Sequence, residues 1–114
     1  MNIAILRGEL TADPRVTELP GGSVVHNFEL ATTRADARLV VPIAWHDPGR
    51  WPRLRRGDEA IVVGVVRRRW FRTGGASRSR TEVLASSVAR PGSQGAKSAI
   101  HAVVGELGRS EPFG

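Results

Sequence analysis

Turn-forming residues divide the chain into short apolar segments, and this division constrains the fold more than any other feature. The clearest interruptions are residues 13–14 (Asp-Pro), 20–23 (Pro-Gly-Gly-Ser), 46–49 (His-Asp-Pro-Gly) and 73–77 (Thr-Gly-Gly-Ala-Ser). Thirteen glycines and seven prolines occur among the 114 residues, a larger share than the average of about 12%. Such a chain is expected to form one small β-rich domain.

The segments between these turns predict about five strands that close into a small barrel. The expected strands are residues 2–10, 23–33, 38–45, 59–69 and 80–88, with a short continuation at 15–19. The strand 23–33 alternates most clearly, and its core-facing residues are expected to be Val24, His26, Phe28 and Leu30. Pro42 confines the third strand to a sheet edge or a bulge.

Helical turns are expected at two places. Residues 50–56 predict a short helical segment between the third and fourth strands, with Trp51 and Leu54 three positions apart and directed inward. Residues 91–95 are typical of a linker, and residues 108–114 of a frayed terminus. Between them, residues 96–107 are compatible with a short amphipathic helix whose apolar positions are Ile100, Val103, Val104 and Leu107.

Residues 60–66 (Ala-Ile-Val-Val-Gly-Val-Val) form a strand that is apolar on both faces. Strands of an antiparallel sheet normally alternate because one face meets water, so this strand needs cover on both sides. The barrel core covers one face. A partner subunit is expected to cover the other, and the alternative is that the C-terminal helix folds back over it.

The positive charge of the chain is confined to one segment. Residues 50–80 contain ten arginines and two acidic residues, a net charge of +8, whereas the other 83 residues carry a net charge of −2. A localised basic field attracts a polyanion. The alternative is a solvated surface of arginines that reflects composition alone, since the chain has sixteen arginines and one lysine.

Residues 67–72 (Arg-Arg-Arg-Trp-Phe-Arg) interleave guanidinium groups with aromatic rings. Arginine binds phosphate in a bidentate manner, and exposed rings are platforms for unpaired bases. The combination predicts binding of single-stranded nucleic acid. The alternative for Trp70 or Phe71 is a core position, although adjacent strand residues point to opposite faces. Trp45 is predicted to face the groove, with the core as its alternative, and Trp51 is predicted to be in the core.

Catalytic and metal-binding patterns are lacking. There is no cysteine, and His26, His46 and His101 do not have the spacing of metal ligands. No nucleophile-elbow motif and no phosphate-binding glycine loop occur. We therefore expect no enzyme activity, no metal and no cofactor. The N-terminus has no basic region before its apolar stretch and no segment is long enough to span a membrane, so a cytoplasmic, nucleoid-associated protein is expected.

The chain resembles the bacterial single-stranded DNA-binding protein family over about residues 1–90. Residues 2–14 resemble the first strand of that family, with its Asn, Gly and Asp-Pro, and residues 22–32 resemble the second strand, with its Phe-x-Leu-Ala core. Residues 54–58 (Leu-Arg-Arg-Gly-Asp) and 62–64 resemble the family's Lys-Gly-Asp turn and following strand. Residues 80–83 resemble the start of the last strand.

This resemblance implies an all-β OB-fold, a five-stranded Greek-key barrel, that usually forms a homotetramer and binds single-stranded DNA in replication, recombination or repair. Residues 1–90 would be the DNA-binding domain, and residues 91–114 a linker and short tail with one helix at most. Aromatic stacking is expected from Trp45, Trp70 and Phe71, and phosphate contacts from Arg34, Arg38, Arg55, Arg56, Arg67, Arg68, Arg69, Arg72, Arg78 and Arg80. The alternative functions are RNA binding and a paralogue that joins hetero-oligomers, and a dimer is the alternative assembly.

Three departures from the family pattern accompany this resemblance. Counted from Gly64, the family's stacking aromatic falls at Phe71 and not at Trp70, and the choice between the two stays open. Leu39 stands where the family has a tryptophan. Residues 111–113 (Glu-Pro-Phe) resemble the family's tail tip but lack its acidic run. These departures predict a short or divergent member, without the tail that recruits repair enzymes.

Overall fold

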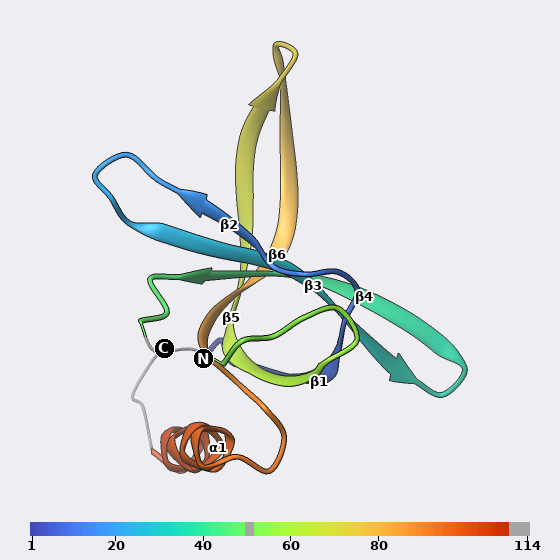
Figure 1. Cartoon of the computed structure of the whole chain (residues 1–114), viewed down its shortest axis with the longest axis vertical. Helices are drawn as coiled ribbons and strands as arrows, with labels where there is room; N and C mark the ends of the chain where they lie inside the picture. The colour runs from blue at the N-terminus through green and yellow to red at the C-terminus, as the bar shows by residue number, and fades with distance from the viewer. Residues whose placement is uncertain (50–51, 110–114) are drawn as a thin grey trace.

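The computed structural model describes residues 1–49 and 52–109, which fold into a β-barrel with one C-terminal helix (Figure 1). The strands are β1 (Ala4–Leu10), β2 (Arg15–Glu18), β3 (Val24–Arg34), β4 (Ala37–His46), β5 (Glu59–Thr73) and β6 (Ala76–Ala89), and the helix is α1 (Gln94–Leu107). The sheet order is β1-β5-β6-β4-β3-β2, and an additional β1–β3 pairing closes the barrel. The expected barrel of five strands is confirmed, with β2 as a short addition at the edge of β3.

The β3–β4 pair supplies much of the core. His26, Phe28 and Leu30 alternate inward along β3 as expected, and all three are buried. The sheet register places Trp45 of β4 directly opposite His26, and the two rings meet edge to face with centroids 6.3 Å apart. Trp45 is 8% exposed and belongs to the core cluster. The prediction that Trp45 faces the groove is therefore wrong, because its cross-strand partner shares the inward face.

The helical segment expected over residues 50–56 is not found in residues 52–56, which form an irregular connection ending in a turn at Arg56 and Gly57. Two backbone N–H groups of this connection bond to aspartate side chains instead of to helical carbonyls. The Arg55 N–H donates to the Asp58 carboxylate, and the Arg56 N–H donates to the Asp13 carboxylate. Leu54 is 5% exposed and joins the core as expected, whereas Trp51 lies outside the described residues, as do residues 111–113.

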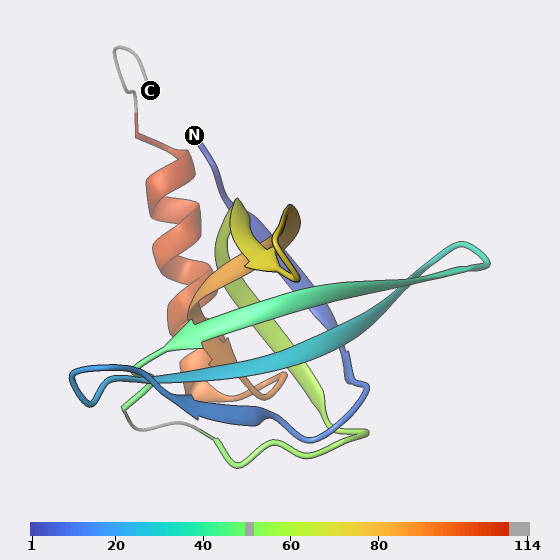
Figure 2. The same ribbon diagram turned by 90° about the horizontal axis from the view of Figure 1, so that it is seen from above.

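Helix α1 lies against the barrel and packs on β6 and β5 (Figure 2). The Ser93 side chain caps it by accepting from the Ala96 N–H, and Ala96 and Val103 are its buried residues. The helix borders the outer side of β5 at Val63, which is 6% exposed. Helix α1 therefore lies beside Val63, as the alternative expects, whereas cover of this face by a partner subunit stays a prediction. Among the described residues, no helix is long and apolar enough to cross a membrane.

The apolar positions expected on α1 are only partly buried. Val103 packs inward, but Val104 and Leu107 are 60% and 56% exposed. A further exposed apolar side chain occurs next to the helix, at Val65 of β5, which lines a depression together with Val103. Fewer apolar side chains of the helix are therefore buried against the sheet than its apolar pattern predicts.

Two hairpins extend beyond the barrel, formed by β3–β4 and by β5–β6 (Figures 1 and 2). At the tip of the second hairpin, Gly74 and Gly75 both have positive φ, at 57° and 82°, as a two-residue turn with right-handed strand twist requires. This turn sets the register of the long β5–β6 pair and so decides which arginines share a face. The expected edge position of the strand with Pro42 is wrong, because β4 lies between β6 and β3. Pro42 is tolerated there because it pairs with β3 and lies just before Ile43 and Ala44, the residues at which β4 pairs with β6 in the described part of the chain.

A methyl group at Gly64 is expected to destabilise the barrel. Gly64 lies at an irregularity in the β5–β6 ladder, and a Cβ there would overlap the Leu84 carbonyl and the Ala85 Cα. Gly64→Ala should lower the free energy of unfolding by about 1 to 3 kcal/mol, measured by urea denaturation. The control Gly105→Ala, on α1 with open space around it, should raise it by about 0.5 to 1 kcal/mol; equal effects would contradict this packing at Gly64.

Burial of His26 makes stability depend on pH. Burial lowers the pKa of the His26 imidazole below its usual value of 6.5. As the pH falls through about 6.5, the unfolded chain takes up a proton while the folded chain does not, so the free energy of unfolding decreases until the lower folded pKa is reached. Denaturation between about pH 7.5 and 5.5 should show this decrease in the wild type. His26→Gln should remove most of it, and His101→Gln, an exposed control, should not.

Candidate nucleic-acid interface

The β5–β6 hairpin sorts the arginine-aromatic segment onto two faces. Cross-strand pairs share a face and successive pairs alternate. The pairs Arg67–Glu82, Arg69–Arg80 and Phe71–Arg78 therefore lie on one side, here called the groove face. The pairs Arg68–Thr81, Trp70–Ser79 and Arg72–Ser77 lie on the other side, here called the reverse face. Arginines that are consecutive in the sequence thus serve two separate surfaces.

The groove face continues across the outside of the barrel as a central groove of about 380 Å³. The groove is lined from five strands, by Arg15, Thr17, Leu19, Val25, Asn27, Ala44, His46, Arg67, Arg69, Arg80 and Glu82. A second depression of about 200 Å³ adjoins it and shares Arg15, Asn27 and Arg80 with it. Besides the two shared arginines, the second depression is lined by the acidic residues Asp13 and Glu29.

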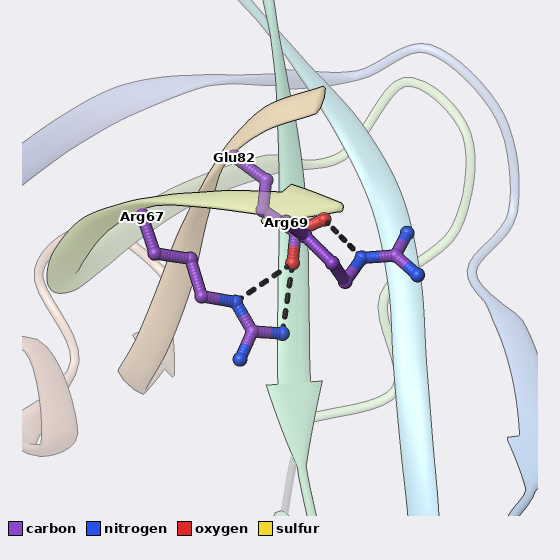
Figure 3. Close-up of polar contacts among 3 residues, drawn as sticks. All are labelled: Arg67, Arg69 and Glu82. Carbon is purple, nitrogen blue, oxygen red and sulfur yellow. Dashed lines mark hydrogen bonds and ion pairs between the residues drawn. The ribbon is translucent and has the colours of Figure 1, made fainter. Parts of the chain in front are cut away.

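Glu82 forms the floor of the central groove and is bound by two arginines (Figure 3). Its Oε2 accepts from Nε and Nη2 of Arg67, at 3.1 and 2.9 Å, and its Oε1 accepts from Nε of Arg69, at 3.1 Å. Glu82 is 3% exposed, whereas the side chains of Arg67 and Arg69 are 35% and 47% exposed. A buried carboxylate needs such paired donors, so Arg67 is largely committed to Glu82.

Arg69 and Arg67 differ in how many guanidinium nitrogens remain available to a ligand. Arg69 uses only Nε on the carboxylate, and Figure 3 shows its two terminal nitrogens directed away from Glu82. Those nitrogens and the cross-strand neighbour Arg80 face the same groove. A guanidinium held at one end and open at the other is oriented for an incoming anion.

The two adjacent aromatic rings lie on opposite faces, as alternation predicts. Phe71 is half-buried on the groove face, with the Arg69 guanidinium carbon 5.6 Å from its ring centroid. Trp70 is 66% exposed on the reverse face, with the Arg68 guanidinium carbon 6.0 Å from its centroid. Each ring therefore has its own arginine, within the distance of a cation–π contact.

The structure separates several predicted site residues from the central groove. Arg38 and Arg56 line a different depression of about 390 Å³. Arg34 lies at the end of β3, next to the β3–β4 turn, and Arg55 lies in the connection before β5, where its backbone bonds to Asp58. Of the predicted arginines, Arg67, Arg69 and Arg80 line the central groove, and Arg78 lies further along the groove face.

Comparison with known proteins identifies the fold family. The model of the single-strand binding protein family matches residues 1–91. This chain belongs to that family. A single-stranded DNA-binding protein from Thermus thermophilus is 34% identical over 99 residues, covering 80% of this chain and 38% of the relative. A single-stranded DNA-binding protein from Thermus aquaticus is 31% identical over 100 residues, covering 80% of this chain and 38% of the relative. The chain thus spans little more than a third of the length of these curated relatives.

This single-strand binding family member has groove residues that the sequence did not reveal. Arg15 lies on β2 and pairs in register with Asn27 of β3, and both line the central groove, as do Thr17 and His46. Arg15 stands alone in the sequence, outside the segment with the high positive charge. Its position directly after the turn at Asp13-Pro14 is the one signal that it belongs to a separate short strand.

Replacing the two arginines that hold Glu82 should have unequal effects on stability. Arg67→Met removes two of the three donors to a buried carboxylate, and Arg69→Met removes one. We expect Arg67→Met to lower the free energy of unfolding by about 2 to 3 kcal/mol and Arg69→Met by about 1 kcal/mol. Urea denaturation without nucleic acid measures both, and the reverse order would contradict these assigned contacts.

Proposed function

We propose that this chain binds single-stranded DNA in the central groove, with little sequence preference. The observation that carries the proposal is the groove itself, in which Arg15, Arg69 and Arg80 approach from three strands. Phe71 lies further along the same face of the hairpin, with its ring centroid 5.6 Å from the Arg69 guanidinium carbon. Membership of the single-strand binding protein family and the names of the Thermus relatives support single-stranded DNA as the ligand. An unpaired strand offers phosphates to the arginines and base faces to the ring.

The groove chemistry favours backbone contacts over base reading. Its guanidinium groups suit phosphate oxygens, which carry no sequence information, and stacking on Phe71 accepts any base. Glu82 offsets part of the arginine charge and fixes Arg67 in place. At least two of the groove arginines, Arg67 and Arg69, are therefore held in a fixed orientation by Glu82.

Arginines outside the groove extend the proposed path. Arg78 continues the groove face toward the hairpin tip. Arg34 and Arg38 on the β3–β4 hairpin, and Arg55 and Arg56 in the connection before β5, would contact phosphates of a longer strand. Trp45 has no part in this path because it lies in the core.

We further propose that copies of this chain associate. Ile5 and Val65 are exposed apolar residues on the neighbouring strands β1 and β5, at 46% and 38%, and strand alternation places both on the outer side of the barrel. Apolar side chains grouped on adjacent strands favour contact with a protein surface. A homo-oligomer would bring several grooves onto one strand, in keeping with a role wherever DNA is single-stranded during replication, recombination or repair. Solution mass, measured with and without oligonucleotide, tests this assembly.

Removing groove arginines should weaken binding and reduce its salt dependence. Arg15 and Arg80 line the groove but do not contact Glu82 in the described contacts. The double variant Arg15→Ala/Arg80→Ala should therefore lower affinity for oligo-dT at least about tenfold and reduce the slope of log K against log salt by about 1.4, or 0.7 per phosphate contact. Fluorescence anisotropy with labelled oligo-dT at several salt concentrations measures both.

Three comparisons make this experiment decisive. Arg7→Ala removes an exposed arginine that pairs with Glu59 outside the groove, and it should leave affinity nearly unchanged. Duplex DNA and oligo-U serve as competitors, since they separate single-stranded DNA from duplex and from RNA binding. Failure of the wild type to bind oligo-dT, or binding that does not depend on salt, would refute the proposed function.

A further inference from the structure

The outer side of β5, here called the outer face, is an apolar surface on which helix α1 lies. Alternation along β5 places Ile61, Val63 and Val65 on this side, since Val62 is fully buried in the core. Ile5 of β1 pairs in register with Val63 and extends the same surface. A strand that is apolar on both sides needs cover on both. Within one chain, α1 is the cover of the outer face.

The cover that α1 gives to the outer face is incomplete. Ala96 and Val103 are the buried residues of the helix. A depression of about 460 Å³ runs along one flank of the helix, and Val65 and Val103 are among its lining residues. A second depression of about 460 Å³ runs along the other flank, with Ile61 and Val104 in its lining. A helix with an open apolar groove on each flank is packed less tightly than the core.

The described polar contacts hold α1 at the segment that leads into it. The Arg90 guanidinium donates to the Arg53 carbonyl at 2.7 Å and pairs with the Asp58 carboxylate at 3.5 Å. In the part of the chain that the structure describes, no hydrogen bond or ion pair joins residues 94–107 to a strand. Gly92 has a positive φ of 77°, which gives the turn before the helix a residue with backbone freedom. Helix α1 is thus tied at its start, and apolar contact holds the rest.

Helix α1 depends on the barrel for its stability. It has 14 residues, with no acidic side chain in its first turn and no basic one in its last turn. A helix of that length is marginal in water without tertiary contacts, and it lacks the charges that would complement its dipole. Because few of its side chains are buried against the sheet, opening of α1 is a local unfolding of low cost.

The chemistry of the outer face suits a second copy of this chain better than a nucleic acid. Arg7 and Glu59 lie on the same side as Ile61 and form an ion pair at 3.0 Å, so this arginine is already neutralised. Figure 1 shows α1 at the end of the molecule opposite the tip of the β5–β6 hairpin. Two copies that meet at the outer face therefore keep their arginine-rich hairpins apart, and an identical apolar face is self-complementary.

A second copy and α1 cannot occupy the outer face together. Two sheets that stack face to face lie about 10 Å apart, and a helix with its side chains is itself about 10 Å across. We propose that α1 is a displaceable cover, and that α1 and a second copy of this chain compete for the outer face. Closed α1 holds the chain back from association, and release of α1 permits it. This inference rests on the proposed association of copies and not on DNA binding, since no described residue of α1 lines the central groove.

The test changes the cover in the full chain and measures self-association by sedimentation over a range of concentrations. Val103→Glu places a charge at the buried contact of α1, and the control Ser98→Glu places the same charge at an exposed position of the helix. Val103→Glu should self-associate at least about tenfold more tightly than the wild type, because a larger fraction of chains has a free outer face. Ser98→Glu should match the wild type. Adding Ile5→Lys to Val103→Glu should abolish the gain.

A second variant acts in the opposite direction. Ala99 lines the same depression as Val103, so Ala99→Leu adds apolar contact there and should hold α1 more firmly. Hydrogen exchange of the α1 amides reports the cover directly, and it should be faster in Val103→Glu and slower in Ala99→Leu. Self-association of Ala99→Leu should be weaker than that of the wild type. If circular dichroism shows that Val103→Glu does not fold, the comparison with Ala99→Leu decides.

The outcomes separate the cover from the proposed association and from DNA binding. Equal association of the wild type, Val103→Glu and Ala99→Leu would leave association standing and refute the competition. Monomers throughout, with exchange showing that α1 is released in Val103→Glu, would refute both. Unchanged exchange of α1 in both variants would also overturn the cover. Association that follows the release of α1 in a chain that does not bind oligo-dT would support the cover and refute the groove.

Discussion

The buried carboxylate of Glu82 joins β6 to β5 where the hairpin leaves the barrel, and it determines which arginine nitrogens the central groove offers to a ligand. The next residue, Val83, packs in the core and pairs with Ile43 in the short parallel contact between β6 and β4. Glu82 itself faces outward, yet it is 3% exposed because Arg67 and Arg69 cover it. A charge removed from water in this way needs its partners. On one face β6 therefore packs into the barrel core, and on the other face the ion pairs join the two strands of the hairpin to each other.

Because of these ion pairs and of strand alternation, the positive charge of residues 50–80 does not form one continuous surface. Counted along the chain, the ten arginines form one basic field. In the fold, Arg67 is committed to Glu82, Arg69 is partly committed, Arg68 and Arg72 lie on the reverse face, and Arg56 lies at a separate depression. Arg15, from outside that segment, joins the groove. The electrostatic surface is therefore distributed over several sites, which suits a long flexible polyanion better than a compact one.

Local patterns predicted the parts of the fold that depend on near neighbours. The alternation in β3, the turn at Gly74 and Gly75 and the opposite orientation of Trp70 and Phe71 all follow from a two-residue period and from glycine's access to positive φ. The helix expected at residues 96–107 from its apolar spacing is likewise found, at Gln94–Leu107. Predictions failed where distant groups compete for the same backbone or the same space. Residues 52–56 give their N–H groups to Asp58 and Asp13, and helix α1 leaves Leu107 in solvent.

The sequence by itself determined that this chain forms a small β-barrel with an arginine-aromatic hairpin, because turn residues, alternation and residue chemistry act over a few positions. Only the tertiary structure decided which of those residues share a surface. Strand register brought Arg15 to Arg80 and placed Trp45 opposite His26 in the core, and it gave Glu82 its two arginines. The physical reason is that a one-residue shift in pairing moves every side chain to the other face, and pairing is settled by packing and closure of the whole barrel.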